Sequence, residues 1–138
     1  MAPPPPSDHP AFRLRLLASP FAVSQLTPDE PVPAHLVRAL ADPAAAQGRF
    51  VSVTRTADEL SVVRETDEAD AAWRCIRIAG PMDFGITGVM ANLTAPLKAA
   101  GVPVFAVSTW NTDYVLVPKD DAERAVRALT DDGWQFDA

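Results

Sequence analysis

The sequence predicts an α+β protein made of two small units in tandem. In the second half of the chain, predicted strands and helices follow the order β-α-β-β-α-β. Part of that pattern recurs in the first half, which points to an internal repeat. The 138 residues are 48% hydrophobic and 22% charged, enough to build a core without disulfides or a structural metal.

The first ten residues hold five prolines and almost no side chains that a core would bury. Such a composition is typical of an extended, disordered tail. We therefore expect a tail over residues 1–10, a first, degenerate unit over residues 11–66 and a second unit over residues 67–138.

The first unit opens with two predicted strands. The stretch "AFRLRLL" alternates apolar and basic residues, and "FAVSQL" follows after the break at Ser19-Pro20. Pro33 favours the first turn of a short helix that runs to about Ala41 and ends at Asp42-Pro43. This helix carries three apolar residues on one side: Leu36, Val37 and Leu40.

Two further strands, "RFVSVTR" and "ELSVVRE", surround a turn at "TAD". The hairpin that they predict is the last element of the first unit before an acidic connector.

The second unit begins with the strand "WRCIRIAG", which Gly80-Pro81 ends. It contains the only cysteine, Cys75, which we expect to be a buried structural thiol. A helix follows from Ile86 and ends at Gly101, with a kink expected at Pro96. Its apolar face consists of Ile86, Val89, Met90, Leu93, Leu97 and Ala100.

The stretch "VFAVSTWNTDYVLVP" predicts a hairpin with an unusual centre. Six polar or aromatic residues, from Ser108 to Asp113, separate its two apolar runs, and none of them is glycine. A two-residue turn would use glycine to supply positive φ angles, so this centre needs another explanation. After it, Asp120 or Asp121 caps a second helix, and "WQF" forms a last short strand.

The internal repeat relates the hairpins of the two halves. "SVTRTADELSVV" aligns with "AVSTWNTDYVLV" at an offset of 54 or 55 residues. The offset of 55 matches Asp58 to Asp113. The first unit then lacks a last strand, and "AFRLRLL" is available to fill that place in its sheet.

The net charge, the lack of targeting segments and the metal-ligating residues restrict the partners, the location and the cofactors that we expect. The net charge of −6 and the pI near 4.7 argue against a nucleic acid, because nucleic-acid affinity depends on lysine and arginine. The sequence shows no signal peptide and no run of about 18 apolar residues, so we expect a cytoplasmic protein. One cysteine and two histidines give no metal set, and we expect no cofactor.

The segment "RIAGPMDFGITGVMANLTAPLKAAGVPVFAVSTWNTDYVLVPKDDAERAVRAL" closely resembles ACT domains. It especially resembles those in tandem ACT amino-acid-binding proteins, including the cytosolic arginine sensor of animal cells, and it also resembles aspartate kinase regulatory domains. The resemblance implies a ferredoxin-like βαββαβ unit with an antiparallel sheet and helices on one face. It also implies an amino acid bound at an interface between units, and a homodimer that completes a set of four units.

The residues in this segment suit a free amino acid. The loop "DFGITG" precedes a helix, so the N–H groups around Gly85 and Ile86 can receive a carboxylate. Asp83 and Asp113 can accept hydrogen bonds from an ammonium group, Thr109 offers a hydroxyl, and Trp110 offers an aromatic face. Two acidic residues favour a basic side chain in the ligand.

Each of these residues also has a purely structural interpretation. The glycines can serve turns, Asp113 can close a turn on its own backbone, and Trp110 can pack in a core or an interface. Ser108 and Thr112 are expected to be turn and sheet hydroxyls. The first half has Arg55 where the alignment puts Trp110, so we expect one site per chain.

Other function classes fit less well. No Ser-His-Asp or Cys-His set and no phosphate-holding loop is present, so we expect no enzyme and no catalytic residues. The predicted central strands lack the aromatic and basic residues of an RNA-binding sheet. The remaining alternatives are an ACT module that only dimerises, without a ligand, and, with less support, a small ferredoxin-like enzyme. We expect an amino-acid-binding regulatory protein that acts on a partner protein not identified by sequence.

Overall fold

The computed structural model describes residues 4–82 and 88–137, and it divides the chain into two compact units. One unit, the terminal unit, joins Met1–Ala18 to Arg74–Ala138. The other, the middle unit, is Ser19–Trp73. This division differs from the expected boundaries because the first strand of the chain lies in the terminal unit.

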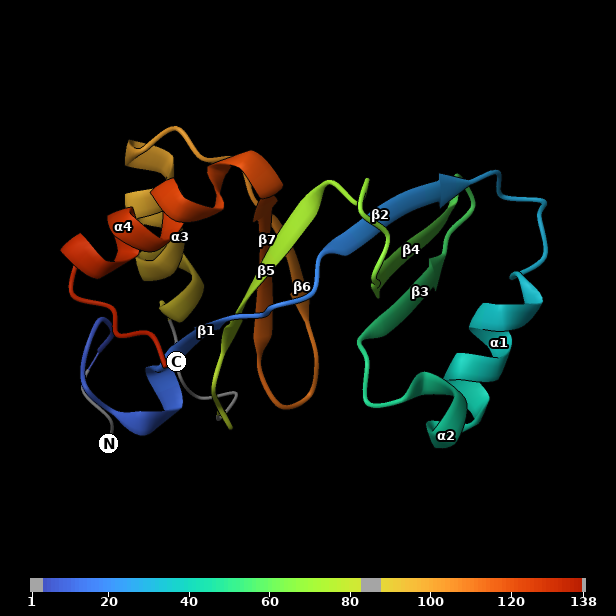
Figure 1. Ribbon diagram of the computed structural model, residues 1–138, viewed down its shortest axis with the longest axis horizontal. Coiled ribbons are helices and arrows are strands. Elements are labelled where there is room, and N and C mark those ends of the chain that lie inside the picture. The colour runs from blue at the N-terminus through green and yellow to red at the C-terminus, as the bar shows by residue number, and fades with distance from the viewer. Residues whose placement is uncertain (1–3, 83–87, 138) are drawn as a thin grey trace. The chain divides into compact units, whose positions relative to one another are not determined.

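The terminal unit is a four-stranded sheet with both of its α-helices on one face (Figure 1). Its strands lie in the order β1-β5-β7-β6, and β1 with β5 and β6 with β7 are antiparallel. The elements are the 3-10 helix η1 (Pro10–Phe12), β1 (Leu14–Leu16), β5 (Trp73–Ile78), α3 (Val89–Ala99), β6 (Phe105–Ser108), β7 (Asp113–Pro118), the 3-10 helix η2 (Lys119–Asp121) and α4 (Ala122–Asp131).

Strand β1 corrects one expectation. Its Leu14 pairs with Ile78 of β5, so "AFRLRLL" completes the sheet of the second unit and not that of the first. Leu14 is fully buried in the core beneath α3 and α4, which no pattern within the strand could indicate. The expected strand "WQF" is reduced to a single bridge, in which Phe136 lies parallel to Leu14.

The core of the terminal unit lies between the sheet and the two helices. The expected face of α3 is confirmed for Val89, Leu93 and Leu97, which are all buried. Gly101, with φ at 73°, ends the helix: its N–H donates to Lys98 and that of Val102 donates to Leu97. The helix continues through Pro96. The other large members of the core are Phe12, Leu14, Ile76, Ile78, Val115, Val117, Leu129 and Trp134.

The proline-rich segment differs from the expected free tail. Pro5 is buried, and its carbonyl oxygen accepts a 2.7 Å hydrogen bond from the side-chain amide of Asn92 on α3. A Cβ placed on Gly133 would lie 3.4 Å from Pro6, so that part of the segment lies against the end of α4. The amino-acid composition of the segment does not predict these contacts, because prolines can lie along a protein surface without a hydrogen-bond partner of their own.

The middle unit is a three-stranded antiparallel sheet with the order β3-β4-β2 and two short helices. Its elements are β2 (Phe21–Leu26), α1 (Ala34–Ala41), α2 (Pro43–Ala46), β3 (Val51–Arg55) and β4 (Leu60–Glu65).

Helix α1 confirms the expected start and end, but only one of its three apolar residues is buried. Leu36 is buried, whereas Val37 and Leu40 are 50% and 55% exposed. Asp42 ends α1 and then caps α2, because its carboxylate accepts a hydrogen bond from the N–H of Ala44. The sequence analysis missed α2, which is only four residues long.

The two hairpins of the repeat superpose in register at an offset that the sequence did not show. Arg55 pairs with Leu60 in the middle unit and Ser108 pairs with Asp113 in the terminal unit, so equivalent residues are 53 positions apart. The offsets of 54 and 55 were therefore wrong. Asp58 corresponds to Asn111, and the residue equivalent to Asp113 is Leu60.

Among the described residues, no helix is both long enough and apolar enough to cross a bilayer.

Candidate functional site

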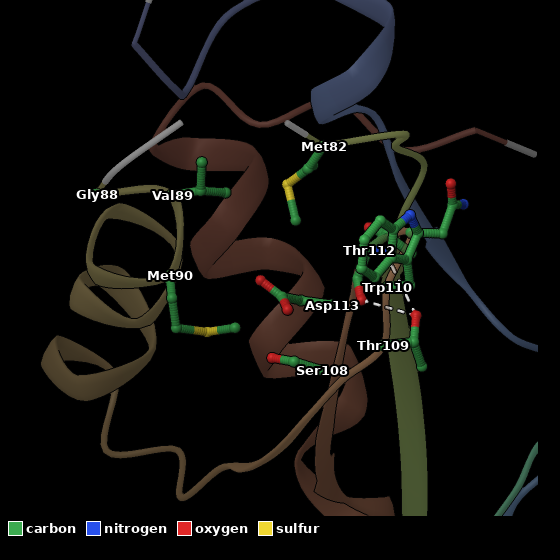
Figure 2. Close-up of a pocket in the computed structure, with 10 residues that line it drawn as sticks. Met82, Gly88, Val89, Met90, Ser108, Thr109, Trp110, Thr112 and Asp113 are labelled. Carbon is green, nitrogen blue, oxygen red and sulfur yellow. Dashed lines mark hydrogen bonds between the residues drawn. The ribbon is translucent and has the colours of Figure 1, made fainter. Parts of the chain in front are cut away.

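A cavity of approximately 300 Å³ opens at the end of the terminal unit's sheet, beside the first turn of α3 (Figure 2). Three segments form it: the end of the loop after β5, the start of α3 and the β6-β7 turn. The residues that line it are Met82, Gly88, Val89, Met90, Ser108, Thr109, Trp110, Asn111, Thr112 and Asp113. All of them belong to the terminal unit.

The β6-β7 turn closes through two threonines, which explains part of its polar centre. The N–H of Thr109 donates to the carbonyl oxygen of Thr112 at 2.9 Å, and the Thr109 hydroxyl donates to the same oxygen at 3.1 Å. The N–H of Thr112 returns a longer bond to the Thr109 hydroxyl oxygen, at 3.4 Å. Hydrogen bonds of the Thr109 side chain therefore close this turn, which contains no glycine. Because the Thr109 hydroxyl proton is already donated to Thr112, the hydroxyl oxygen can only accept a hydrogen bond from a ligand.

The turn is also tied to the end of β5. The hydroxyl of Thr112, a residue only 2% exposed, donates to the carbonyl oxygen of Ile78 at 2.7 Å. The N–H of Met82 donates to the carbonyl oxygen of Asn111 at 2.9 Å. At Gly80, φ is +64° and an added Cβ would lie 3.0 Å from both the Asn111 oxygen and the Thr112 Cβ. These contacts fix the turn against the segment that follows β5.

Asp113 is the first residue of β7 and points to the helix side of the sheet, like Val115 and Val117. Figure 2 shows its carboxylate in the space between the turn and α3, with the thioethers of Met82 and Met90 on either side. It is the one charged side chain among the described residues that line the cavity. The described part of the cavity is therefore negative and partly apolar.

The opposite wall is the amino end of α3. Gly88 takes the N-cap position with φ at 79°, and no side-chain hydrogen bond caps the helix there among the described residues. The first N–H groups of a helix have no partner within the helix and carry a partial positive charge. A carboxylate group at this wall and an ammonium group at Asp113 would each meet the opposite charge.

Trp110 stands at the tip of the turn, and 83% of its surface is exposed. It lines the cavity mouth without being part of the core. The core interpretation of Trp110 is thereby ruled out, while a role against a ligand or a second protein surface remains available.

The structure describes three of the six expected site residues. Thr109, Trp110 and Asp113 line one cavity. Asp83, Gly85 and Ile86 lie outside the described residues. The expected sheet and turn roles of Ser108 and Thr112 hold, because Ser108 ends β6 and Thr112 lies in the turn with its hydroxyl bonded to Ile78, yet both also line the cavity.

Sequence reasoning missed Met82 and Met90 as cavity residues, whereas Gly88 was considered for close backbone approach to a ligand and does line the cavity. Met90 was assigned to the buried face of the helix, and it is half-buried in the structure. The sequence could have identified them by their positions before and after "DFGIT", because residues on both sides of a loop that precedes a helix converge on the end of the sheet.

The middle unit repeats the turn but not the acidic group. Thr56 closes its turn as Thr109 does, with its N–H donating to Glu59 at 2.9 Å and its hydroxyl accepting from the N–H of Glu59 at 3.2 Å. Leu60, fully buried, stands where the other hairpin has Asp113. The middle unit therefore has no carboxylate at the position of Asp113.

Within residues 4–82 and 88–137, no group of three or more His, Cys, Asp or Glu side chains is arranged to hold a metal ion. Cys75 is buried, as expected.

Comparison with known families accounts for the arrangement in the second half of the chain. A family model described as an ACT domain matches residues 68–131. Residues 68–131 therefore form an ACT domain. A second model, described as an N-terminal domain, matches residues 19–70. The ACT match covers β5, α3, β6, β7 and α4, the elements that surround the cavity.

Curated relatives of this ACT domain include animal arginine sensors. The human protein named "cytosolic arginine sensor for mTORC1 subunit 1" is 35% identical over 65 residues, which are 46% of this chain and 20% of that protein. The rat protein of the same name is 39% identical over 65 residues, with the same coverage. The chain thus spans about a fifth of the length of these relatives.

Solved structures support the fold over nearly the whole chain. A protein from Agrobacterium tumefaciens is 33% identical with a TM-score of 0.74, and the match covers 93% of each chain. The aspartate kinase regulatory subunit from Thermus thermophilus is 16% identical with a TM-score of 0.63, and the match covers 89% of this chain and 98% of that one. The second likeness concerns the fold alone. The expected fold class, tandem ferredoxin-like ACT units with antiparallel sheets, is confirmed.

Proposed function

We propose that this ACT protein is a regulatory protein without catalytic activity and that it binds a free amino acid in the cavity beside α3. The observation that carries the proposal is the placement of Asp113, the one charged side chain among the described lining residues, opposite the amino end of α3, which no side chain of the described residues caps. A zwitterion presents a carboxylate and an ammonium group a few ångströms apart. The two walls supply a partner for each group.

The ligand's orientation follows from these charges. Its carboxylate lies against the first N–H groups of α3, and its ammonium group lies against Asp113. The Thr109 hydroxyl oxygen, whose proton is already donated to Thr112, adds an acceptor on the ammonium side. The remaining expected residues, Asp83, Gly85 and Ile86, keep their proposed roles in the loop that leads into α3.

A basic or neutral side chain fits the cavity better than an acidic one. The described lining contains no arginine or lysine to pair with a second carboxylate. A second cationic group can instead meet Asp113, or the ring of Trp110 at the mouth. The name of the animal relatives, which describes them as arginine sensors, supports the same preference.

The proposal includes a homodimer and a regulated partner protein, in the cytoplasm. The cavity is open at Trp110, and a second copy of the chain would cover its mouth and complete the enclosure of the ligand. The Thermus neighbour is a regulatory subunit by name, and the animal relatives are named as cytosolic, which supports a signalling role of this kind.

Thermal unfolding in the presence of each of the twenty amino acids tests the proposal. At 100 times its dissociation constant, a ligand that binds only the folded state stabilises it by about 2.7 kcal/mol, which is a rise of several degrees in Tm. We expect one or a few amino acids to give that rise, with arginine and lysine tested first. Mass spectrometry of small molecules released from the purified protein is the second measurement.

The alternative is an ACT module that only joins proteins together. If none of the twenty amino acids shifts the Tm and no amino acid is released on denaturation, that structural role replaces the sensor proposal.

A further inference from the structure

The sheet of the terminal unit has a second face, opposite to the helices, and this face carries three arginines. Leu14, Ile76 and Ile78 point to the helix side and are fully buried. Because successive residues of a strand alternate between faces, Arg13 and Arg15 of the β1 segment and Arg77 of β5 point to the other side. They line a cavity of approximately 210 Å³ together with Leu14, Ala79 and Asp137.

Two of these arginines stand directly opposite each other. Arg15 pairs with Arg77 in the antiparallel ladder of β1 and β5. Like charges at directly opposed positions of a sheet destabilise the pairing. No carboxylate of the described residues forms an ion pair with Arg15 or Arg77, so the structure itself does not neutralise this pair.

The third arginine does have partners. The Nε of Arg13 donates to the carboxylate of Asp137, and its Nη1 donates to the side-chain oxygen of Gln135 at 2.6 Å. Asp137 is therefore occupied by Arg13. The cavity keeps a net positive charge from Arg15 and Arg77.

The guanidinium group of Arg77 is held in place with one donor unused. Its carbon lies 5.8 Å from the ring centre of Tyr114 on β7, over the ring. Its Nε is buried and, within the described residues, has no hydrogen-bond partner. A buried donor without a partner is costly, and a charged one more so, unless a ligand supplies the acceptor.

We propose that Arg15 and Arg77 form a binding site for a small oxyanion, a carboxylate or a phosphate group, on this face of the sheet. The anion accepts hydrogen bonds from the guanidinium fork of Arg77 and pairs with the guanidinium of Arg15. It removes the repulsion between the two arginines. The site is separate from the cavity at α3, whose described lining is negative, so an anionic ligand and an amino acid do not compete.

Titration with inorganic phosphate and with succinate tests the site, at constant ionic strength in a buffer without other oxyanions. We expect saturable binding by isothermal calorimetry and a rise in Tm beyond that produced by sodium chloride. Binding of phosphate alone or of succinate alone identifies the source of the oxyanion. If neither ion binds saturably, the proposal is wrong.

Arg15→Gln is the main variant, because Arg15 is exposed and its replacement leaves the core intact. Its affinity for the ion should fall about tenfold or more, the usual loss of one charged hydrogen-bond partner. At low salt without the ion, its Tm should lie above that of the wild type, because the repulsion with Arg77 is gone. A merely structural arginine would show the opposite change in Tm.

Two further variants complete the test. Arg77→Lys keeps the charge but loses the fork and should also weaken ion binding. Arg127→Gln, an exposed arginine on α4, makes the same change in net charge and should bind the ion as the wild type does. Equal losses in Arg15→Gln and Arg127→Gln would mean general charge screening and would overturn the proposal. The amino-acid response of all three variants is measured separately, so failure of this site is distinguished from failure of the other.

Discussion

Thr112 donates its hydroxyl proton to the carbonyl oxygen of Ile78 across 2.7 Å, and both residues are buried. This bond joins the tip of one hairpin to the end of the central strand β5. It therefore ties the turn that lines the α3 cavity to the sheet beneath it. Thr112→Val keeps the shape of the side chain and leaves that carbonyl without this partner.

We expect Thr112→Val to lower the free energy of unfolding by about 1–3 kcal/mol, the usual cost of a buried polar group that loses its partner. Urea unfolding followed by circular dichroism measures it. Thr54→Val is the control, because Thr54 is exposed on β3, and it should change stability little. Equal effects of the two substitutions would mean that the bond is not a structural tie.

Gly80 has a positive φ and no room for a side chain. Gly80→Ala places a Cβ at 3.0 Å from the backbone oxygen of Asn111, in addition to the backbone strain. Gly101→Ala has a similar φ of +73° with nothing within 4 Å, so it should cost only the strain, about 1–2 kcal/mol. We expect a clearly larger loss of Tm for Gly80→Ala, and a smaller one would contradict the close approach of the turn to β5.

Asp113→Asn tests the charge that the proposed function requires. It keeps the shape of the side chain and removes the negative partner of the ammonium group. We expect affinity for the amino acid found by the screen to fall more than tenfold, since a charged hydrogen bond contributes about 1.5–3 kcal/mol. Isothermal calorimetry measures the change.

Asp58→Asn is the matched control for this charge. Asp58 is an exposed carboxylate in the turn of the middle unit, where it corresponds to Asn111 and not to Asp113. Its substitution should leave affinity unchanged. If the two variants bind alike, the ligand does not use Asp113.

The proline-rich segment should contribute to stability. Removal of residues 1–10 takes away the buried Pro5 and the acceptor of the Asn92 amide. A lost hydrogen bond of this kind costs about 0.5–1.5 kcal/mol, so we expect a lower Tm. Removal of residues 1–3 alone should have a smaller effect, and an unchanged Tm for the longer deletion would restore the interpretation of a free tail.

The homodimer is tested by light scattering at micromolar concentration. We expect twice the chain mass of 14.8 kDa. Strand β6 stands at the edge of its sheet, where an unpaired backbone can take up a second copy. Ala106→Lys places a charge on this exposed edge and should shift the equilibrium toward monomer, whereas Ala57→Lys in the other hairpin turn should not. A monomer mass for the wild type would rule out the dimer.

The sequence alone predicted the features that depend only on the residue pattern within one segment. The face of α3 that holds Leu93 and Leu97 follows from helical periodicity, and the end at Gly101 follows from the need for a positive φ. The hairpin around Thr109 to Thr112 follows from two apolar runs separated by polar residues. Three of the six expected site residues, Thr109, Trp110 and Asp113, line one cavity, because they belong to one such turn.

Tertiary structure decided what depends on a distant partner. A half-buried strand such as "AFRLRLL" has the same alternation whichever sheet it joins, and only the core beneath α3 and α4 explains its pairing with β5. The offset of 53 between the hairpins is determined by which residues pair across each turn, and Leu60 rather than Asp58 therefore occupies the place of Asp113. The opposition of Arg15 and Arg77 arises in the same way, because register between strands is a property of the folded sheet and not of either strand.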